Sequence, residues 1–339
     1  MMTNGIDRVA REAAIVGFLA DHGWDKAERR LLAGDASFRR YDRLTDAAGN
    51  RAVLMDAPPP MEDVRPFIAI DRLLYDLGLS APRIMGEDAA NGLLLLEDFG
   101  DDTYTRLLAR GHDETALYEL ATDALIALHQ RLPQAALAGL RKFDLDSALR
   151  QVSLLLDWYW PELHGAPPPA EMRAEFEAAW RQVLPLWHRL PDTIVLFDFH
   201  IDNLLLLPGR AGVQACGLLD FQDALSGPLA FDLVSLLEDV RRNVPMPLMR
   251  AMIERYLAAN PQLGRDDFMT VYAVSGAQRN TRIAGTFTRL LRRDGKAGYQ
   301  RYMPRVWELI AHDISHPALA PVAAWYAKHL PPHDRKVFA

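Results

Sequence analysis

Three side chains suited to phosphoryl transfer lie within a short stretch of this chain. Asp198 and Asn203 have four residues between them, and Asp220 follows 22 positions after Asp198. In phosphoryl transfer an aspartate receives the proton of the attacking hydroxyl, while an asparagine and a second aspartate hold magnesium on the phosphates. Carboxylate and amide oxygens are hard ligands of the kind that magnesium prefers. The spacing therefore predicts Asp198 as the catalytic residue and Asn203 and Asp220 as magnesium ligands.

Two apolar runs must position these residues. Residues 194–197 and 216–219 each form a run of four apolar residues that ends in an aspartate, which is typical of a buried strand. The apolar run Leu204–Leu207 and the turn at Pro208–Arg210 predict a short hairpin between them. The competing interpretation is that Asp198 and Asn203 form only a turn or helix cap.

Composition limits the class of protein. A chain of 339 residues suits about two lobes, and its net charge of −7 argues against general nucleic-acid binding. Cys216 is the only cysteine, so an intrachain disulfide is excluded, and it is expected to be a small buried residue.

The N-terminal residues also bear on where the protein works. Asp7, Glu12 and Asp21 interrupt any apolar signal segment, and no apolar run is long enough to span a bilayer. A cytoplasmic protein without a membrane or nucleic-acid partner is expected, acting as a monomer on a small molecule.

The N-terminal part is predicted to be rich in strands. An amphipathic helix at residues 6–21 precedes them, and a second helix is expected at residues 60–77. Turn residues between short alternating runs predict strands at Glu28–Ala33, Arg39–Thr45, Arg51–Asp56, Arg83–Gly86 and Leu93–Glu97.

Two segments of this part are candidates for nucleotide contacts. The hairpin tip Gly34–Phe38 could cover phosphates with backbone N–H groups and the Ser37 hydroxyl. Neighbouring strand residues face opposite ways, so at most one of Arg39 and Arg40 points at the nucleotide. The segment Glu97–Asp101 suits either a connector that offers backbone groups to adenine or an ordinary turn.

Beyond Asp101 the sequence predicts mostly helices. A helix over residues 229–237 carries Asp232, which we expect to accept bonds from the loop around Asp198 rather than take part in chemistry. A long helix over residues 266–293 carries a polar stripe that includes Gln278, Arg282 and Arg289. Such a stripe is usually solvated, although Arg279 or Arg282 could face an anionic substrate group.

With these residues in view, the chain resembles the aminoglycoside phosphotransferase family, whose fold is that of eukaryotic-type protein kinases. The resemblance includes the segments EDFGD, DFHIDN, LLDFQD and GPLAFDL. It implies an α+β, bilobal fold, with residues 1–97 as an antiparallel-sheet lobe covering the nucleotide and residues 98–339 as a mainly helical lobe. Asp198, Asn203, Asp220 and Asp232 fall on the family's catalytic, metal and loop-bracing positions.

A narrower set of segments is similar to bacterial anomeric kinases of cell-wall amino sugars. GDASFRRYDRL, AVLMDAPPP and QRNTRIAGTFTRLLRRDGK carry this likeness. It implies ATP- and Mg²⁺-dependent phosphorylation of the C1 hydroxyl of N-acetylmuramate and N-acetylglucosamine in peptidoglycan recycling. The nucleotide-contact candidates are Gly34, Ser37, Phe38, Arg39, Met55, Glu97 and Phe99, and the sugar-contact candidates are His200, Gln222, Asp223 and Arg279.

Two departures from the broader family pattern leave alternatives open. Leu196 replaces the usual histidine before the catalytic aspartate, and Met55 replaces the lysine that pairs with the nucleotide phosphates. An arginine such as Arg39 or Arg40 could substitute, magnesium could carry more of the charge, or the protein could be a non-catalytic pseudokinase. A kinase for an aminoglycoside, choline or homoserine is the nearest enzyme alternative, with an acidic cleft drawn from Glu162, Asp223, Glu238 and Asp239.

Overall fold

The computed structural model describes residues 8–34 and 38–339. Chain contacts divide it into two compact units, one of residues 1–124 and 202–223, the other of residues 125–201 and 224–339. The first of the three points at which the chain passes between the units falls within helix α4 (Glu114–Arg131). The predicted lobe boundary after residue 97 stays a prediction.

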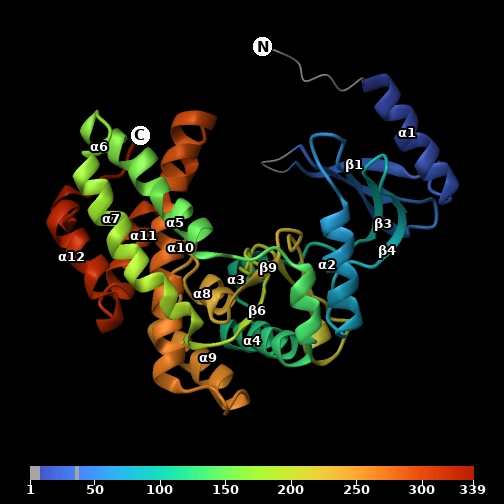
Figure 1. Cartoon of the computed structure of the whole chain (residues 1–339). Helices are drawn as coiled ribbons and strands as arrows, with labels where there is room; N and C mark the ends of the chain where they lie inside the picture. Colours follow the sequence, from blue (N-terminus) through green and yellow to red (C-terminus); the bar gives the residue numbers. More distant parts are fainter. Residues whose placement is uncertain (1–7, 35–37) are drawn as a thin grey trace. The chain divides into compact units, whose positions relative to one another are not determined.

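The first unit is built on a five-stranded antiparallel sheet, drawn in blue to teal in Figure 1. Its strands are ordered β1-β2-β3-β5-β4, and each predicted strand is present to within two residues at either end. Gly49 turns the chain between the second and third strands with φ 83°, a conformation that glycine adopts without a steric penalty. The strands are β1 (Glu28–Gly34), β2 (Arg40–Thr45), β3 (Arg51–Asp56), β4 (Ile84–Asp88) and β5 (Leu93–Glu97).

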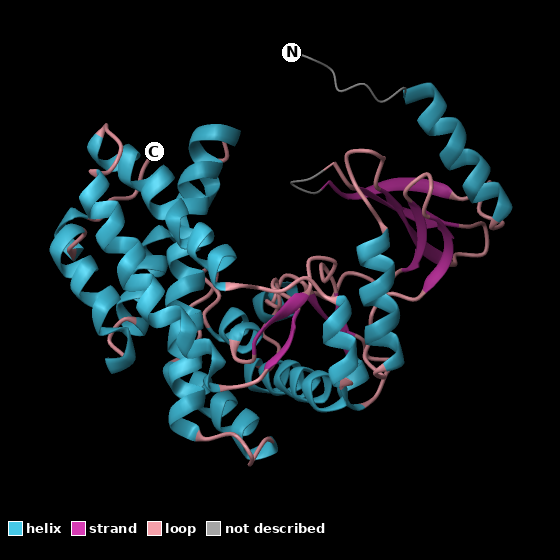
Figure 2. Ribbon diagram, viewed as in Figure 1, coloured by secondary structure: helices cyan, strands magenta, loops and turns pink. Residues whose placement is uncertain are grey.

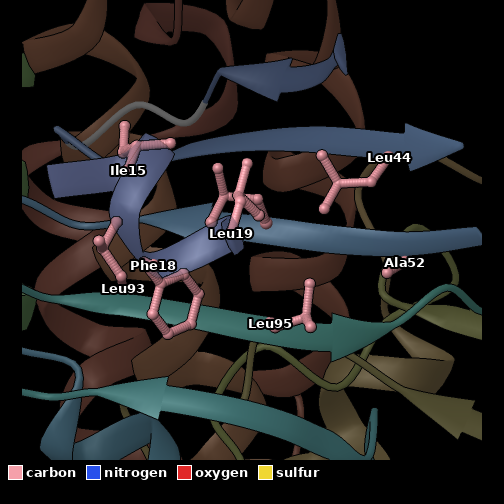
Figure 3. Packing of buried hydrophobic residues seen from close by; sticks show 8 residues of the cluster. Ile15, Phe18, Leu19, Leu44, Ala52, Leu93 and Leu95 are labelled. Carbon is pink, nitrogen blue, oxygen red and sulfur yellow. The ribbon is translucent and has the colours of Figure 1, made fainter. Parts of the chain in front are cut away.

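Helix α1 (Arg8–Asp21) covers one face of this sheet. Ile15, Phe18 and Leu19 are its buried residues, and Figure 3 shows them over side chains of β2, β3 and β5. Burying each such side chain contributes about 1.5–3 kcal/mol. Because strand side chains alternate between faces, Val53 and Met55 point to the opposite face from Ala52 and Leu54.

Helix α2 (Arg65–Asp76) begins five residues later than the sequence predicts. Pro66 lies in its first turn, where a residue without a backbone N–H is tolerated, and residues 60–64 form a turn and loop instead. Its Asp71 is only 3% exposed, and Oδ2 of that side chain has no hydrogen-bond partner among the described residues.

Asp71 should make the stability of the protein depend on pH. Burial raises its pKa from 3.8 to about 7, with Arg72 opposing the rise and Glu97 adding to it. The unfolded chain therefore releases this proton near pH 4 and the folded chain near pH 7, so stability is lost as pH rises between these values. The loss is on the order of 4 kcal/mol. About 3 kcal/mol of this loss falls between pH 5 and pH 8. We expect Asp71→Asn to remove it in denaturant unfolding at these two pH values, and parallel pH profiles of the two chains would contradict this.

A short hairpin completes the first unit. Strands β7 (Leu204–Leu206) and β8 (Cys216–Leu218) pair antiparallel, as the sequence predicts. Leu218 N–H donates to the Ser80 carbonyl at 2.8 Å, and the Arg210 guanidinium donates to Ser80 and Glu97. These bonds fix the hairpin, and with it the residues on either side, to the end of the sheet.

The second unit is mainly helical, with one short strand pair (Figure 2). Strand β6 (Asp192–Val195) pairs with β9 (Leu225–Pro228), although Gly227 and Pro228 are residues typical of turns. Among the described residues, no helix is both long and apolar enough to cross a membrane. The helices of this unit beyond α4 include α5 (Leu145–Leu154), α6 (Trp160–His164), α7 (Ala170–Val183), α8 (Phe231–Leu237), α9 (Met246–Ala259), α10 (Arg265–Asp294), α11 (Met303–Asp313) and α12 (Ala320–His329).

Helix α10 runs through the second unit and is buried on every side along its central turns. Gln278 is fully buried and donates to Gln151, and Arg279 is 3% exposed. The expectation of a solvated stripe on this helix is therefore wrong. Gly285 explains part of the difference, since a Cβ there would lie 2.2 Å from the Leu154 carbonyl carbon. The glycine lets another backbone segment pack directly on the helix.

Candidate functional site

The backbone before Asp198 is held by the start of helix α8. Asp232 accepts hydrogen bonds from the N–H groups of Leu196 at 2.6 Å and Phe197 at 3.0 Å. Phe197 has φ 75°, a left-handed conformation that is uncommon for a residue with a side chain. Its ring stacks on Phe231 at 5.5 Å with an interplanar angle of 8°. Two backbone bonds and one ring contact therefore stabilise the turn that presents Asp198.

Asp232 is buried, and burial raises its pKa to about 7. The two N–H donors oppose this rise, and the Asp198 carboxylate adds to it. Both carboxylate oxygens of Asp232 serve as acceptors, so its geometry is that of a structural group in this loop.

Removing the Asp232 carboxylate should destabilise the loop and the fold. In Asp232→Ala two buried N–H groups lose their acceptor, and we expect a loss of roughly 3 kcal/mol in the free energy of unfolding. Denaturant titration measures this loss. Ser235→Ala is a matched control on the same helix, because its hydroxyl makes only a 3.4 Å bond to the Phe197 carbonyl and should cost under about 1 kcal/mol. Equal losses in the two variants would contradict the bracing role.

Asp198 lines a cavity of about 400 Å³ within the second unit. The Arg282 guanidinium in this cavity lies 4.3 Å from the centre of the Phe197 ring. Burial lowers the pKa of Arg282 to about 10; the Asp198 charge opposes this and the charges of Arg279 and Arg289 add to it. The lining residues are Gln151, Leu154, Asp198, His200, Val240, Arg241, Arg279, Arg282, Ile283, Thr286, Phe287, Arg289, Leu290 and Tyr299.

Asn203 and Asp220 come together in the first unit. Asn203 Nδ2 donates to Asp220 Oδ2 at 3.4 Å, and the Asn203 carbonyl accepts from Leu219 N–H at 2.9 Å. Asp220 has φ 58°, and Gln222 Nε2 donates to its Oδ1 at 2.7 Å. The backbone on both sides therefore turns these two side chains toward each other.

The side chains of Asn203 and Asp220 offer the kinds of ligand atom that magnesium binds. The pair offers one carboxylate and one amide oxygen, and magnesium usually takes one or two protein ligands together with water and phosphate oxygens. The described part of the chain contains no group of three or more His, Cys, Asp or Glu side chains able to hold a metal. A site with two protein ligands does not need such a group.

Asn203 and Asp220 also line a pocket of about 430 Å³ in the first unit, together with Glu97 and Phe99. Arg43 pairs with Asp98 and Asp101 at 2.7 and 3.0 Å and fixes the segment that forms one wall. The lining residues are Leu32, Tyr41, Val53, Phe67, Pro82, Leu96, Glu97, Asp98, Phe99, Gly100, Asp101, Thr103, Arg106, Asn203, Leu205, Leu219 and Asp220.

Of the other nucleotide-contact candidates, Phe38, Arg39 and Met55 are described and do not line this pocket. Gly34 ends strand β1, and Ser37 lies outside the described residues. Phe38 N–H donates to Glu62 at 3.0 Å, Arg39 pairs with the same carboxylate at 3.6 Å, and Met55 is buried. Their contacts with a nucleotide stay predictions.

The sugar-contact candidates lie in different places. His200 and Arg279 line the cavity that holds Asp198, whereas Gln222 bonds to Asp220 and Asp223 is exposed. The cavity residues to which the sequence interpretation gave no function include Arg241, Arg289 and Tyr299. Of these three, only Arg289 could have been suspected from the sequence, because it lies on the polar stripe of α10.

Comparison with a family model and with known proteins points to the same family. Residues 28–266 match the phosphotransferase enzyme family, APH. A protein of Caulobacter vibrioides named N-acetylmuramate/N-acetylglucosamine kinase is 36% identical, over 96% of this chain and 98% of its own length. A protein of Pseudomonas aeruginosa with the same name is 36% identical, over 86% of each chain.

Solved structures show the fold. A choline/ethanolamine kinase family protein from Mesorhizobium loti matches with a TM-score of 0.60 and 14% identity, over 93% of this chain and 98% of its own. The streptomycin–ATP–APH(2″)-IIa ternary complex matches with a TM-score of 0.57 and 16% identity, over 94% and 98%. The predicted α+β, protein-kinase-like fold is confirmed.

Proposed function

Because the chain belongs to the phosphotransferase enzyme family, we propose that it transfers the terminal phosphoryl group of ATP to the anomeric hydroxyl of N-acetylmuramate and N-acetylglucosamine. The observation that carries the choice of acceptor is the naming of relatives 32–36% identical over most of the chain, all as kinases of these two sugars. The product would be a sugar 1-phosphate, in keeping with recycling of cell-wall amino sugars.

Asp198 is the proposed catalytic residue. The C1 hydroxyl oxygen attacks the γ-phosphorus, the bond from that phosphorus to the bridging oxygen breaks, and ADP leaves. Asp198 orients the hydroxyl and takes its proton. Because the transition state is loose, orientation contributes more than basicity. The bonds from Asp232 to the preceding turn support this role, since they hold the backbone that carries the carboxylate.

Asn203 and Asp220 would hold the magnesium ion. Bound there, the ion would neutralise negative charge on the phosphates. The two side chains already converge, and they share a pocket with Glu97 and Phe99, which we assign to the nucleotide. The backbone of residues 97–101 would meet the adenine, and the ion pairs of Arg43 keep that backbone in place.

Arg39 is the proposed replacement for the missing phosphate-binding lysine. Tyr41 lines the pocket, and Arg39 lies two positions earlier, directly before β2 begins, so alternation continued by one residue would put it on the face of Tyr41. Arg40 belongs to the other face, where it pairs with Asp42 at 2.8 Å. A complex with an ATP analogue tests this assignment, which fails if the Arg39 guanidinium lies out of hydrogen-bond reach of every phosphate.

The charge around Asp198 favours a neutral or anionic acceptor over a cationic one. Of the acids considered for a cationic substrate, Glu238 and Asp239 are fully buried and Glu162 pairs with Arg292. None of them lines the cavity, whereas four arginines do. An aminoglycoside or choline would meet repulsion there.

A substrate panel tests the proposal. ADP release is coupled to a spectrophotometric readout with N-acetylglucosamine, N-acetylmuramate, kanamycin, choline and homoserine as acceptors. We expect turnover with the two amino sugars only. Turnover of kanamycin, choline or homoserine without either sugar would overturn the choice of acceptor, and ATP binding without turnover of any acceptor would indicate a pseudokinase.

A further inference from the structure

The cavity that holds Asp198 contains more positive charge than the proposed reaction needs. Four arginines line it, and Asp198 is the only carboxylate among its lining residues. Two of the arginines have structural partners. The Arg279 guanidinium donates to the Glu238 carbonyl, and the Arg241 guanidinium donates to Asp239 at 3.2 Å. Arg282 lies over the Phe197 ring beside Asp198 and belongs to the catalytic end of the cavity.

Arg289 differs from these three. Its Nε is buried without a hydrogen-bond partner, as are the Nε atoms of Arg279 and Arg282, but among the described residues the Arg289 side chain also makes no other hydrogen bond, ion pair or ring contact. The nearby acid Asp294 is paired with Arg293 at 2.7 Å. Arg289 follows Arg282 by seven residues on α10, which places it on the same face about 10 Å further along the axis. Its charge is therefore presented to the cavity away from the turn that carries Asp198.

We propose that Arg289 binds the lactyl carboxylate of N-acetylmuramate and sets the preference for this acidic sugar over neutral N-acetylglucosamine. The inference rests on the proposed function. The two sugars differ only in the lactyl ether on C3, so a group that recognises the carboxylate must lie away from the residue that meets the C1 hydroxyl. Arg289 and Asp198 meet this condition within one cavity.

The surroundings of Arg289 suit a sugar acid. Ile283, Phe287 and Leu290 line the same cavity and offer apolar contacts for the ring face and the lactyl methyl group. A guanidinium can bind a carboxylate through two parallel charge-assisted hydrogen bonds. Partial burial strengthens this attraction, and an anion here also offsets the repulsion that Arg289 exerts on Arg282.

Steady-state kinetics of Arg289→Leu with three acceptors test the proposal. The acceptors are N-acetylmuramate, its methyl ester and N-acetylglucosamine, so the charge is removed separately from the protein and from the sugar. We expect KM for N-acetylmuramate to rise roughly tenfold to a hundredfold. KM for the methyl ester and for N-acetylglucosamine should stay within about twofold, because neither carries the charge that Arg289 binds. Arg289→Lys should show an intermediate loss, since it keeps the charge but not the fork geometry.

Arg293→Leu is the matched control, an exposed arginine on the same helix that does not line the cavity. It should leave all three acceptors unchanged. Turnover of N-acetylglucosamine by Arg289→Leu shows that the variant is folded. An equal change for all three acceptors, or no change for any, would overturn the role of Arg289 and leave the proposed function standing. Failure of the unaltered chain to phosphorylate either sugar would instead overturn the proposed function, and this inference with it.

Discussion

Asp198→Asn should lower kcat with N-acetylglucosamine by about a thousandfold, while the free energy of unfolding stays nearly unchanged. Asparagine keeps the shape of the side chain but cannot accept the proton of the attacking hydroxyl. The backbone at Asp198 is held through Leu196 and Phe197, whose N–H groups donate to Asp232, so the loop should keep its conformation. ADP release measures the rate, and denaturant unfolding checks the fold.

Asp202→Asn is the matched control for this prediction. Asp202 lies in the same loop, where it accepts a bond from the Thr105 hydroxyl, and it has no role in the proposed reaction. Its kcat should stay within a few-fold of the unaltered chain. A near-normal kcat for Asp198→Asn would show that another group receives the proton.

Asp220→Ala should have the second largest effect, a loss of about a hundredfold or more in kcat at a fixed magnesium concentration. Asp220 supplies the one carboxylate of the proposed magnesium pair, and Asn203 alone offers only a neutral amide oxygen. The magnesium concentration for half-maximal rate should rise in the variant. Removing magnesium with EDTA should stop turnover in the unaltered chain.

Asp202→Asn serves again as the control, since it borders Asn203 without belonging to the pair. Its magnesium dependence should match that of the unaltered chain. If Asp220→Ala kept both its rate and its magnesium dependence, the ion would have to be held elsewhere.

Much of the fold could be predicted from the sequence because its signals are local. The short alternating strands of the sheet and the hairpin at Leu204–Leu206 follow from apolar periodicity and turn residues. The types and spacing of Asp198, Asn203 and Asp220 predicted the chemistry. Asn203 and Asp220 converge where the backbone turns to positive φ at Asp220, a conformation that an aspartate at this position does not by itself indicate.

Other features depend on tertiary packing and had no local signal. Strand β9 has the sequence LSGP, whose glycine and proline indicate a turn, and only its pairing with β6 makes it a strand. Helix α10 carries charged residues, which the sequence analysis expected to face solvent. Gly285 lets a neighbouring backbone approach and Arg279 donates to a buried carbonyl, so the central turns of the helix are buried. The arginines around Asp198 are therefore cavity residues rather than surface residues.

The most direct test of the central claim is the position of the phosphate on the product. N-acetylglucosamine labelled with ¹³C at C1 is incubated with the protein, ATP and magnesium, and the product is followed by ³¹P NMR. A new phosphorus signal coupled to the labelled C1 and its proton is the predicted result. A phosphomonoester signal without coupling to C1, or ATP consumption without any phosphorylated sugar, would contradict the assignment of this chain as an anomeric sugar kinase.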